Sequence, residues 1–185
     1  AASVNAQAQD ISAIYSLAGN VAISKGNAAI GGAVTYNNIA NTIETKAGAT
    51  SFNTGAGDTS LLANDNATIM SGAVAAGGAK GTALMLSFGW NQTANNTSAT
   101  LENGSVVTAA NLNVDAGNNS TIESLSGSVG IGGTAGVGLS ASMDDIGDNT
   151  TATLQNTGID LAGGVTVQAI GSGTQYALAV AGSTG

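Results

Sequence analysis

The sequence has no cysteine, no proline, no histidine and no arginine among its 185 residues. Without cysteine there are no disulfides and no thiol chemistry. Without histidine, cysteine and arginine, the usual general bases, activated nucleophiles and bidentate anion binders are missing. We therefore expect a protein that is not an enzyme, and we assign no catalytic, cofactor-binding or metal-binding residue and no cofactor.

Charged residues are also scarce, at 8% of the chain, with a formal net charge of −8. The only cations are Lys25, Lys46 and Lys80, which are far apart in the sequence. Nucleic-acid binding needs clustered cations to displace the counterions of the phosphates, so no nucleic acid is expected as a partner. An acidic chain of this kind also fits poorly with adsorption to anionic membranes.

Aromatic residues make up only 3% of the chain, yet 43% of its residues are hydrophobic and 28 are glycine. Small apolar residues suit a narrow interior in which neighbouring backbones approach closely. Disordered chains are poor in β-branched residues and rich in Pro, Glu and Lys. Here valine, isoleucine and threonine recur in alternation, which favours a folded chain of short strands.

An internal repeat is visible through three landmarks. The pattern N-T-x-A-T-L-x-N spans Asn96–Asn103 and recurs 53 residues later at Asn149–Asn156, with a looser first copy beginning at Asn41 in which Ile43 takes the place of Leu101. Leu112–Ala116 matches Val165–Ala169, again 53 residues later. The third landmark is the start of a long alternating run, which falls at Ile14, Ile69, Ile122 and Tyr176. Repeats of this kind indicate stacked structural units.

Each unit follows a common plan of period-two runs separated by Gly, Asn and Asp, which is the signature of strands and turns. In the third unit a run over Ile122–Ile131 is followed by a glycine-rich turn at Gly132–Gly136 and a second run at Val137–Met143. A polar bend at Asp144–Asn149 then leads to the T-x-A-T-L strand, and two short strands follow. These short strands are expected at 159–161 and 165–169. The pattern predicts an all-β chain.

One such unit cannot bury its apolar residues alone, whereas stacked units place like residues above like residues. We therefore predict a parallel β-helix, or β-solenoid, built from units of about 54 residues. The whole segment, 1–185, is expected to be a single solenoid piece of a longer array, with approximate units at 14–68, 69–121 and 122–175 and a partial unit at 176–185. A unit of this length would suit three coils of about 18 residues or two longer ones.

The run that contains S-T-I, S-G-S-V-G-x-G-G and N-T-T-A-T-L is fullest over Val114–Asn156 and fainter over Ile11–Asn64. It resembles the repeats of very large secreted adhesins of Gram-negative bacteria, in the style of the leukotoxin-like and filamentous-haemagglutinin-like proteins of fusobacteria. The resemblance implies a right-handed β-helix, export across the outer membrane, and a place outside the cell or on its surface. The implied function is a structural or adhesive stalk or passenger segment that mediates attachment to a host-cell receptor or glycan, in contact with neighbouring repeats of the same chain.

An alternative function is a membrane-engaging segment of a leukotoxin-type secreted toxin. The apolar stretch Ala73–Trp90 raises this question, because its length approaches that of a membrane-spanning segment. Lys80 and the glycines of the stretch argue against it, and a membrane is therefore not the expected partner.

Two small groups of side chains invite a functional interpretation. Asp144, Asp145 and Asp148 are the densest set of carboxylates and would suit calcium, but aspartates also support polar turns, which we favour. Phe88 and Trp90 fall on one face of a strand and would make a sugar-stacking or partner-binding patch if exposed. We expect them in the core, because large aromatic side chains are mostly buried.

Sugar attachment at N-x-S/T triplets is a further hypothesis. The asparagines of these triplets are Asn66, Asn91, Asn95, Asn96, Asn103, Asn118, Asn119 and Asn149.

Overall fold

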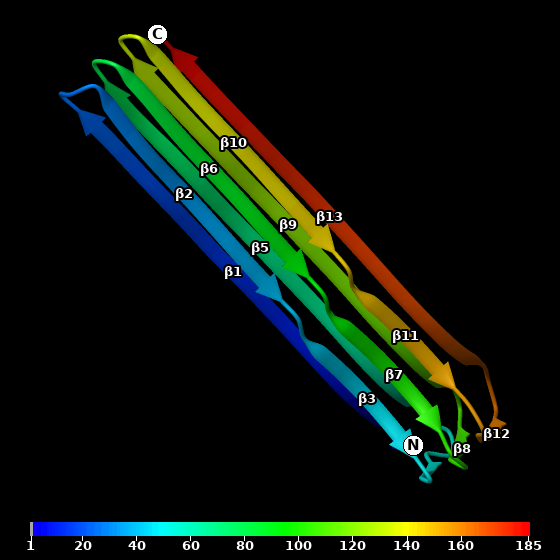
Figure 1. Cartoon of the computed structure of the whole chain (residues 1–185). Helices are drawn as coiled ribbons and strands as arrows, with labels where there is room; N and C mark the ends of the chain where they lie inside the picture. Colours follow the sequence, from blue (N-terminus) through cyan, green and yellow to red (C-terminus); the bar gives the residue numbers. More distant parts are fainter. Residues whose placement is uncertain (1) are drawn as a thin grey trace.

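The computed structural model describes residues 2–185, which form strands, turns and bends without any helix (Figure 1). Ala1, which the sequence interpretation included in the solenoid segment, lies outside the described residues. In this part of the chain no helix has the length and apolar character needed to cross a membrane. The strands are β1 (Val4–Ser24), β2 (Ala28–Ile39), β3 (Thr42–Gly48), β4 (Ser51–Asn53), β5 (Thr59–Ala79), β6 (Thr82–Thr93), β7 (Asn96–Glu102), β8 (Val106–Ala109), β9 (Leu112–Gly132), β10 (Ala135–Ile146), β11 (Asn149–Leu154), β12 (Gly158–Leu161) and β13 (Val165–Thr184).

Four long strands form one parallel sheet in the order β1-β5-β9-β13. We call it the long sheet. Its register pairs Val4 with Thr59, Thr59 with Leu112, and Leu112 with Val165. Because the alternation is in phase from strand to strand, one face of the long sheet is inward along its whole length.

The shorter strands form three more parallel sheets, β2-β6-β10, β3-β7-β11 and β4-β8-β12. After each long strand the chain reverses and returns through one strand of each of these sheets before it begins the next long strand (Figure 1). Each circuit is therefore a single flattened coil, in which a long strand lies opposite the returning strands. The prediction of an all-β chain of stacked parallel strands is confirmed, and the sheets are consistent with a β-solenoid.

The strand boundaries differ from those expected from the sequence. Residues 165–169 are not a separate short strand but the start of β13, and Asp144 and Asp145 lie inside β10 rather than in a turn. The division of a unit into three coils, or two, is also wrong, because between two paired long strands the described chain makes only one circuit. The turn between β9 and β10 is shorter than the predicted Gly132–Gly136, because only Gly133 and Thr134 lie outside the two strands.

The register confirms some repeat landmarks and corrects others. Ile14, Ile69 and Ile122 are paired neighbours, but Ile122 pairs next with Gln175 and not with Tyr176. A shift of one residue reverses the face on which a side chain lies. Tyr176 is consequently on the outer face of the sheet.

The first copy of the T-x-A-T-L strand is also shifted from the predicted alignment. Leu101 pairs with Ala47, whereas Ile43 pairs with Thr97. The predicted and observed alignments differ by an even number of residues, so Ile43 faces inward in both, and the period-two pattern alone does not distinguish them.

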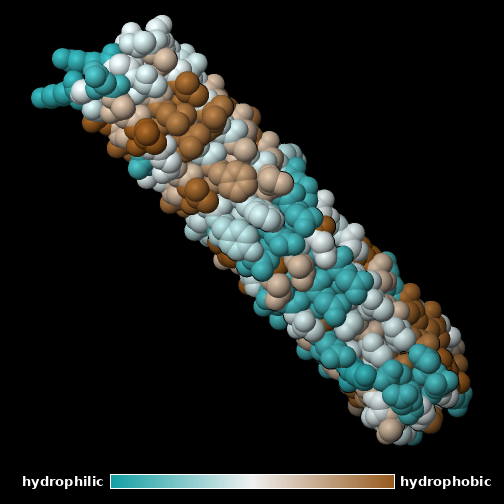
Figure 2. All heavy atoms as spheres, in the orientation of Figure 1, coloured by the Kyte–Doolittle hydropathy of each residue, from teal (hydrophilic) through white to brown (hydrophobic). Residues whose placement is uncertain are grey.

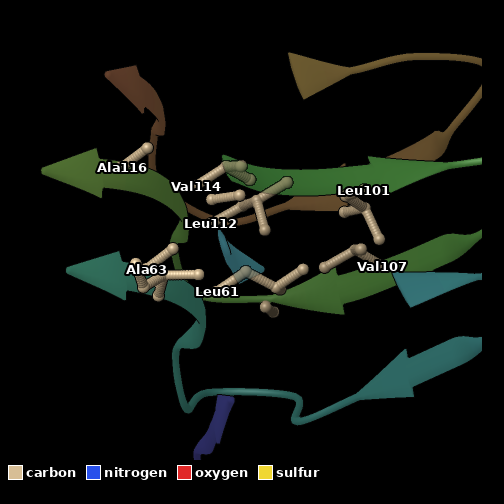
Figure 3. Packing of buried hydrophobic residues seen from close by; sticks show 10 residues of the cluster. Leu61, Ala63, Leu101, Val107, Leu112, Val114 and Ala116 are labelled. Atoms are coloured by element: carbon tan, nitrogen blue, oxygen red, sulfur yellow. The ribbon is translucent and has the colours of Figure 1, made fainter. Parts of the chain in front are cut away.

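The largest cluster of buried apolar side chains lies where the long sheet faces β7 and β8. Leu61, Leu101, Val107, Leu112 and Val114 are all fully buried there and contact one another (Figure 3). Complete burial of a leucine or valine side chain stabilises a fold by about 1.5–3 kcal/mol relative to exposure. This cluster is therefore the main apolar core.

The coils share a left-handed residue just after the strands β3, β7 and β11. The residues are Ala49, Asn103 and Asn156, with φ angles of 51°, 57° and 49°. Asparagine tolerates this conformation better than most residues with a side chain, and it occupies the site in the second and third coils. Alanine in the first coil is the exception.

Candidate functional surface

The outer face of the sheet β2-β6-β10 carries large apolar side chains. From the start of each strand to Tyr36, Trp90 and Met143, the large apolar side chains point outward, and the inward residues are small apart from Met85. The exposed large residues are Ile30, Val34, Tyr36, Leu86, Trp90, Val137, Leu139 and Met143. Figure 2 shows this surface as a predominantly brown area over the end of the molecule to which β2, β6 and β10 belong.

Phe88 and Trp90 are part of this outer face, so the expectation that they fill the core is wrong. Trp90 is 44% exposed, and its ring meets Tyr36 edge to face, with centroids 5.9 Å apart and an interplanar angle of 84°. Phe88 is half-buried between its neighbours on the same face. The sequence placed both residues correctly on one face but did not identify that face as the outer one.

The long sheet also carries large apolar side chains on its outer face, over the C-terminal part of each strand. The exposed large residues there are Tyr15, Leu17, Val21, Ile23, Met70, Val74, Leu125, Val129, Ile131, Tyr176, Leu178 and Val180. An open hollow of about 740 Å³ lies among Met70, Leu125, Tyr176 and Leu178, beside Glu123. Its lining is mainly apolar, and its shape is that of a shallow surface depression.

The interior between these two faces is thin, because it is filled by alanine, serine and glycine. Ala73, Ala75 and Ala83 are fully or almost fully buried there, and Met85 is the largest buried side chain. A Cβ atom on Gly130 would collide with the carbonyl oxygen of Val137. Glycine at this position therefore lets the two sheets approach until only small side chains fit between them.

We call this part of the molecule the inverted end. It comprises Tyr15–Ser24 of β1 and the strand segments in register with it on β5, β9 and β13, together with β2, β6 and β10 as far as Tyr36, Trp90 and Met143. The rest of the coil, which includes the main apolar core, is the ordinary end. The outward residues of the ordinary end are mostly polar, for example Asn5, Gln7 and Asn113.

A row of aromatic and other large side chains marks the base of the inverted end on both faces. On the long sheet, Tyr15, Met70, Glu123 and Tyr176 are successive partners in register. On the opposite sheet the row is Tyr36, Trp90 and Met143. Across the interior, the hydroxyls of Ser124 and Ser142, next to Glu123 and Met143, hydrogen-bond to each other, which puts the two rows at one height.

Below this row the interior contains two polar layers. In the first, Asn37 donates a hydrogen bond to Asn91 (2.7 Å), and Asn91 donates one to Asp144 (2.8 Å). Asp144 also accepts a hydrogen bond from Ser124 (2.8 Å). This ladder joins the three coils through buried or half-buried side chains.

The second polar layer contains one carboxylate and one carboxamide from each coil. The pairs are Asp10 with Asn41, Asp65 with Asn95, and Asn118 with Asp148. Asn41 donates to Asp10 (2.7 Å), Asn118 donates to Asp65 (3.1 Å), and the backbone N–H of Asn95 donates to Asp148 (2.7 Å).

Burial raises the pKa of Asp65 to about 6, and the neighbouring charges of Asp10 and Asp148 contribute to that rise. Asp65 is 5% exposed, and one of its carboxylate oxygens has no hydrogen-bond partner among the described residues. The charge on this carboxylate is therefore poorly solvated inside the coil.

The three aspartates considered for calcium do not converge. Asp144 and Asp148 point into the interior at different heights, and Asp145 points outward, where it accepts a hydrogen bond from Gln92 (3.1 Å). Over residues 2–185 there is no group of three or more acidic, histidine or cysteine side chains with the geometry to hold a metal ion. Asp148 lies between β10 and β11, and its carboxylate accepts a hydrogen bond from the backbone N–H of Asn95 in the preceding coil.

The N-x-S/T asparagines divide by burial. Asn91, Asn95 and Asn118 are buried in the folded coil and cannot carry a sugar there. The others are exposed, namely Asn66, Asn96, Asn103, Asn119 and Asn149.

Tyr15, Tyr36 and Tyr176 are residues on the outer faces of the inverted end that sequence reasoning missed. A usable signal was present, since in Tyr15–Ser24 the large side chains occupy one set of alternate positions and Ser16, Ala18, Ala22 and Ser24 occupy the other.

Comparisons of the chain with protein-family models, with curated proteins and with solved structures find no match.

Proposed function

We propose that this chain is a structural and adhesive segment of a large bacterial adhesin, secreted or displayed on the cell surface, and not an enzyme. In this proposal its coils belong to a longer right-handed array with a repeat of about 54 residues, and neighbouring repeats are its first partners. The support is the in-register stack of long parallel strands, together with a sequence that lacks histidine, cysteine and arginine.

The open edges of the stack favour continued stacking. Val165 and Val167 occupy inward positions on β13, in register with the buried Leu112 and Val114, yet they are 45% and 42% exposed. A further coil would cover them and bury apolar surface, which is the usual source of stability in solenoids.

The observation that carries the adhesive part of the proposal is the exposed pair of Tyr36 and Trp90 beside Phe88. Aromatic rings presented edge to face on a flat sheet offer apolar surfaces on which sugar rings stack. The ligand class that fits this patch is a host-cell glycan or glycosylated receptor.

The test is binding of the folded fragment to host cells and to a glycan panel, with Trp90→Ala and Phe88→Ala as variants. Tyr176→Ala is the matched control, because it removes an exposed aromatic side chain from the opposite sheet. The proposal predicts saturable binding that falls at least tenfold in the first two variants and is unchanged in the control, with the same circular dichroism spectrum in all. No saturable binding by the unmodified fragment would contradict the adhesive role and leave a spacer role.

A further inference from the structure

The inverted end is apolar on both broad faces over the same stretch of the coil. The outward residues of β1 from Tyr15 to Ile23 and those of β2 from Ile30 to Tyr36 lie back to back across a thin interior. A protein partner usually covers one face of a sheet. A medium that surrounds the molecule contacts both faces at once, and the hydrocarbon layer of a lipid bilayer is an apolar medium of this kind.

The height of this surface matches the hydrocarbon layer. From Tyr15 to Ile23 the strand rises about 26 Å at roughly 3.3 Å per residue, and the hydrocarbon core of a bilayer is about 30 Å thick. The base of the surface carries Tyr15 and Tyr176 on one face and Tyr36 and Trp90 on the other, all at one height. Tyrosine and tryptophan are enriched where a protein crosses from water into lipid.

The charged residues are also distributed along the coil as expected for a surface that enters a bilayer. All 11 Asp and Glu residues lie at the level of this aromatic row or in the ordinary end, and none lies between the row and the tip. The tip turns of the first two coils carry Lys25 and Lys80. In Figure 2 the turn after β1 projects from the brown end as a hydrophilic tip. Lysine side chains at such a tip reach lipid head groups and pair with anionic ones.

We propose that the inverted end inserts tip first into a lipid bilayer, as far as the row formed by Tyr15, Tyr36, Trp90 and Tyr176. This goes beyond the adhesive role and does not depend on it. The objection from Lys80 and the glycines of Ala73–Trp90 loses its force, because the glycines and alanines are mostly inward and Lys80 is at the tip. Backbone groups at the edges of β1 and β13 have no strand partner among residues 2–185, so insertion requires other copies of the chain to pair with those edges.

The experiment uses vesicles of phosphatidylcholine and phosphatidylglycerol, with Trp90 as an intrinsic probe, because it is the only tryptophan. An environment-sensitive fluorophore is attached to Val21→Cys in one sample and to Gln7→Cys in another. These two positions are both outward on β1, one in the inverted end and one in the ordinary end.

Insertion predicts that Trp90 emission shifts to the blue and is quenched more by shallow than by deep lipid bromines. It also predicts a several-fold rise in fluorescence for the probe at position 21 and no change at position 7. Val74→Asn should weaken vesicle binding about tenfold, and Val106→Asn, an equally exposed valine of the ordinary end, should not.

Three results would overturn the proposal. One is the absence of co-flotation with vesicles by protein whose circular dichroism shows intact strands. Another is an equal response of the probes at positions 7 and 21. The last is self-association of copies in solution that protects position 21 without any lipid, which would assign the inverted faces to contacts between copies.

Discussion

The two ends of the same coil distribute their side chains in opposite ways. At the ordinary end Leu101 is 0% exposed and packs against Leu61 and Leu112, while polar side chains cover the outside. At the inverted end Leu86 is 42% exposed, and its inward neighbours are Met85 and Ser87. Backbone, register and alternation are continuous between the two.

The difference shows that side-chain size, and not alternation alone, decides which face of a strand is inward in a stack of this kind. Where the inward residues are leucine and valine the sheets are held apart and enclose a core. Where they are alanine, serine and glycine the sheets close on each other, and the large residues of the other parity are left outside.

The largest expected effect comes from the same truncation made at each end. Leu101→Ala should lower the free energy of unfolding by about 3 kcal/mol, because it removes buried atoms and leaves a cavity. Leu86→Ala should lower it by less than about 1 kcal/mol, because much of that side chain is already in contact with solvent. Urea unfolding followed by circular dichroism measures both, and equal losses would contradict the division into two ends.

Enlarging an inward residue at the inverted end is the next test. Ala75→Leu should destabilise the coil by about 2 kcal/mol, because the closely spaced sheets have no room for three more carbon atoms. Ala76→Leu, one residue later on the outer face, should change stability by less than about 0.5 kcal/mol. A larger loss for Ala76→Leu in thermal unfolding would show that the faces have been assigned the wrong way round.

The polar layer near the boundary of the two ends gives a pH-dependent effect. The pKa of Asp65 is about 6 in the folded state, above its usual value near 4, and the charged groups that face it are Asp10 and Asp148. Below about pH 4 the carboxyl is protonated in both states, and as the pH rises through 6 the folded state must hold a buried charge, so stability is lost.

Asp65→Asn should abolish most of this loss and make the protein more stable at pH 8 by about 1–2 kcal/mol, somewhat less than a shift of two pKa units implies, because Asp10 and Asp148 in the same layer are partly exposed to solvent. Urea midpoints at about pH 3.5 and pH 8 report it, because these two values lie below and above the range in which the loss develops. Asp160→Asn, which changes an exposed aspartate, is the control and should keep the unmodified slope.

The smallest effect is expected at the turn of the first coil. Ala49 has a φ of 51° where the next two coils have Asn103 and Asn156. Ala49→Asn should raise the melting temperature, with a gain of about 0.5–1 kcal/mol, because asparagine tolerates the left-handed conformation better. Asn103→Ala is the reciprocal change and should lose a similar amount, and a loss in both variants would contradict the explanation.

Much of the fold was predictable from the sequence, because alternation and the spacing of Ile14, Ile69 and Ile122 depend on local pattern. The number of coils in a unit was not predictable, since the sequence does not reveal that a 21-residue run such as Leu112–Gly132 is one straight strand. Gly117 and Gly127 are the kind of residue that marks a turn, yet both lie within this strand and do not end it.

The candidate surface was predictable only in part. Phe88 and Trp90 were identified as a pair, but their placement in the core followed the general burial of aromatic residues. The interior at their level is already filled by residues from other strands, such as Thr35 and Ser126, which are far apart in sequence. The outward direction of Trp90 therefore depends on packing between coils, which no local pattern contains.

Thiol accessibility of single-cysteine variants tests the inversion most directly, because the chain has no cysteine of its own. Leu86→Cys and Ser87→Cys report the inverted end, and Leu112→Cys and Asn113→Cys report the ordinary end. The account predicts fast labelling at positions 86 and 113 and slow labelling at 87 and 112, so that in these pairs the large apolar residue is the accessible one only at the inverted end. Slow labelling at 86 with fast labelling at 87 would contradict it.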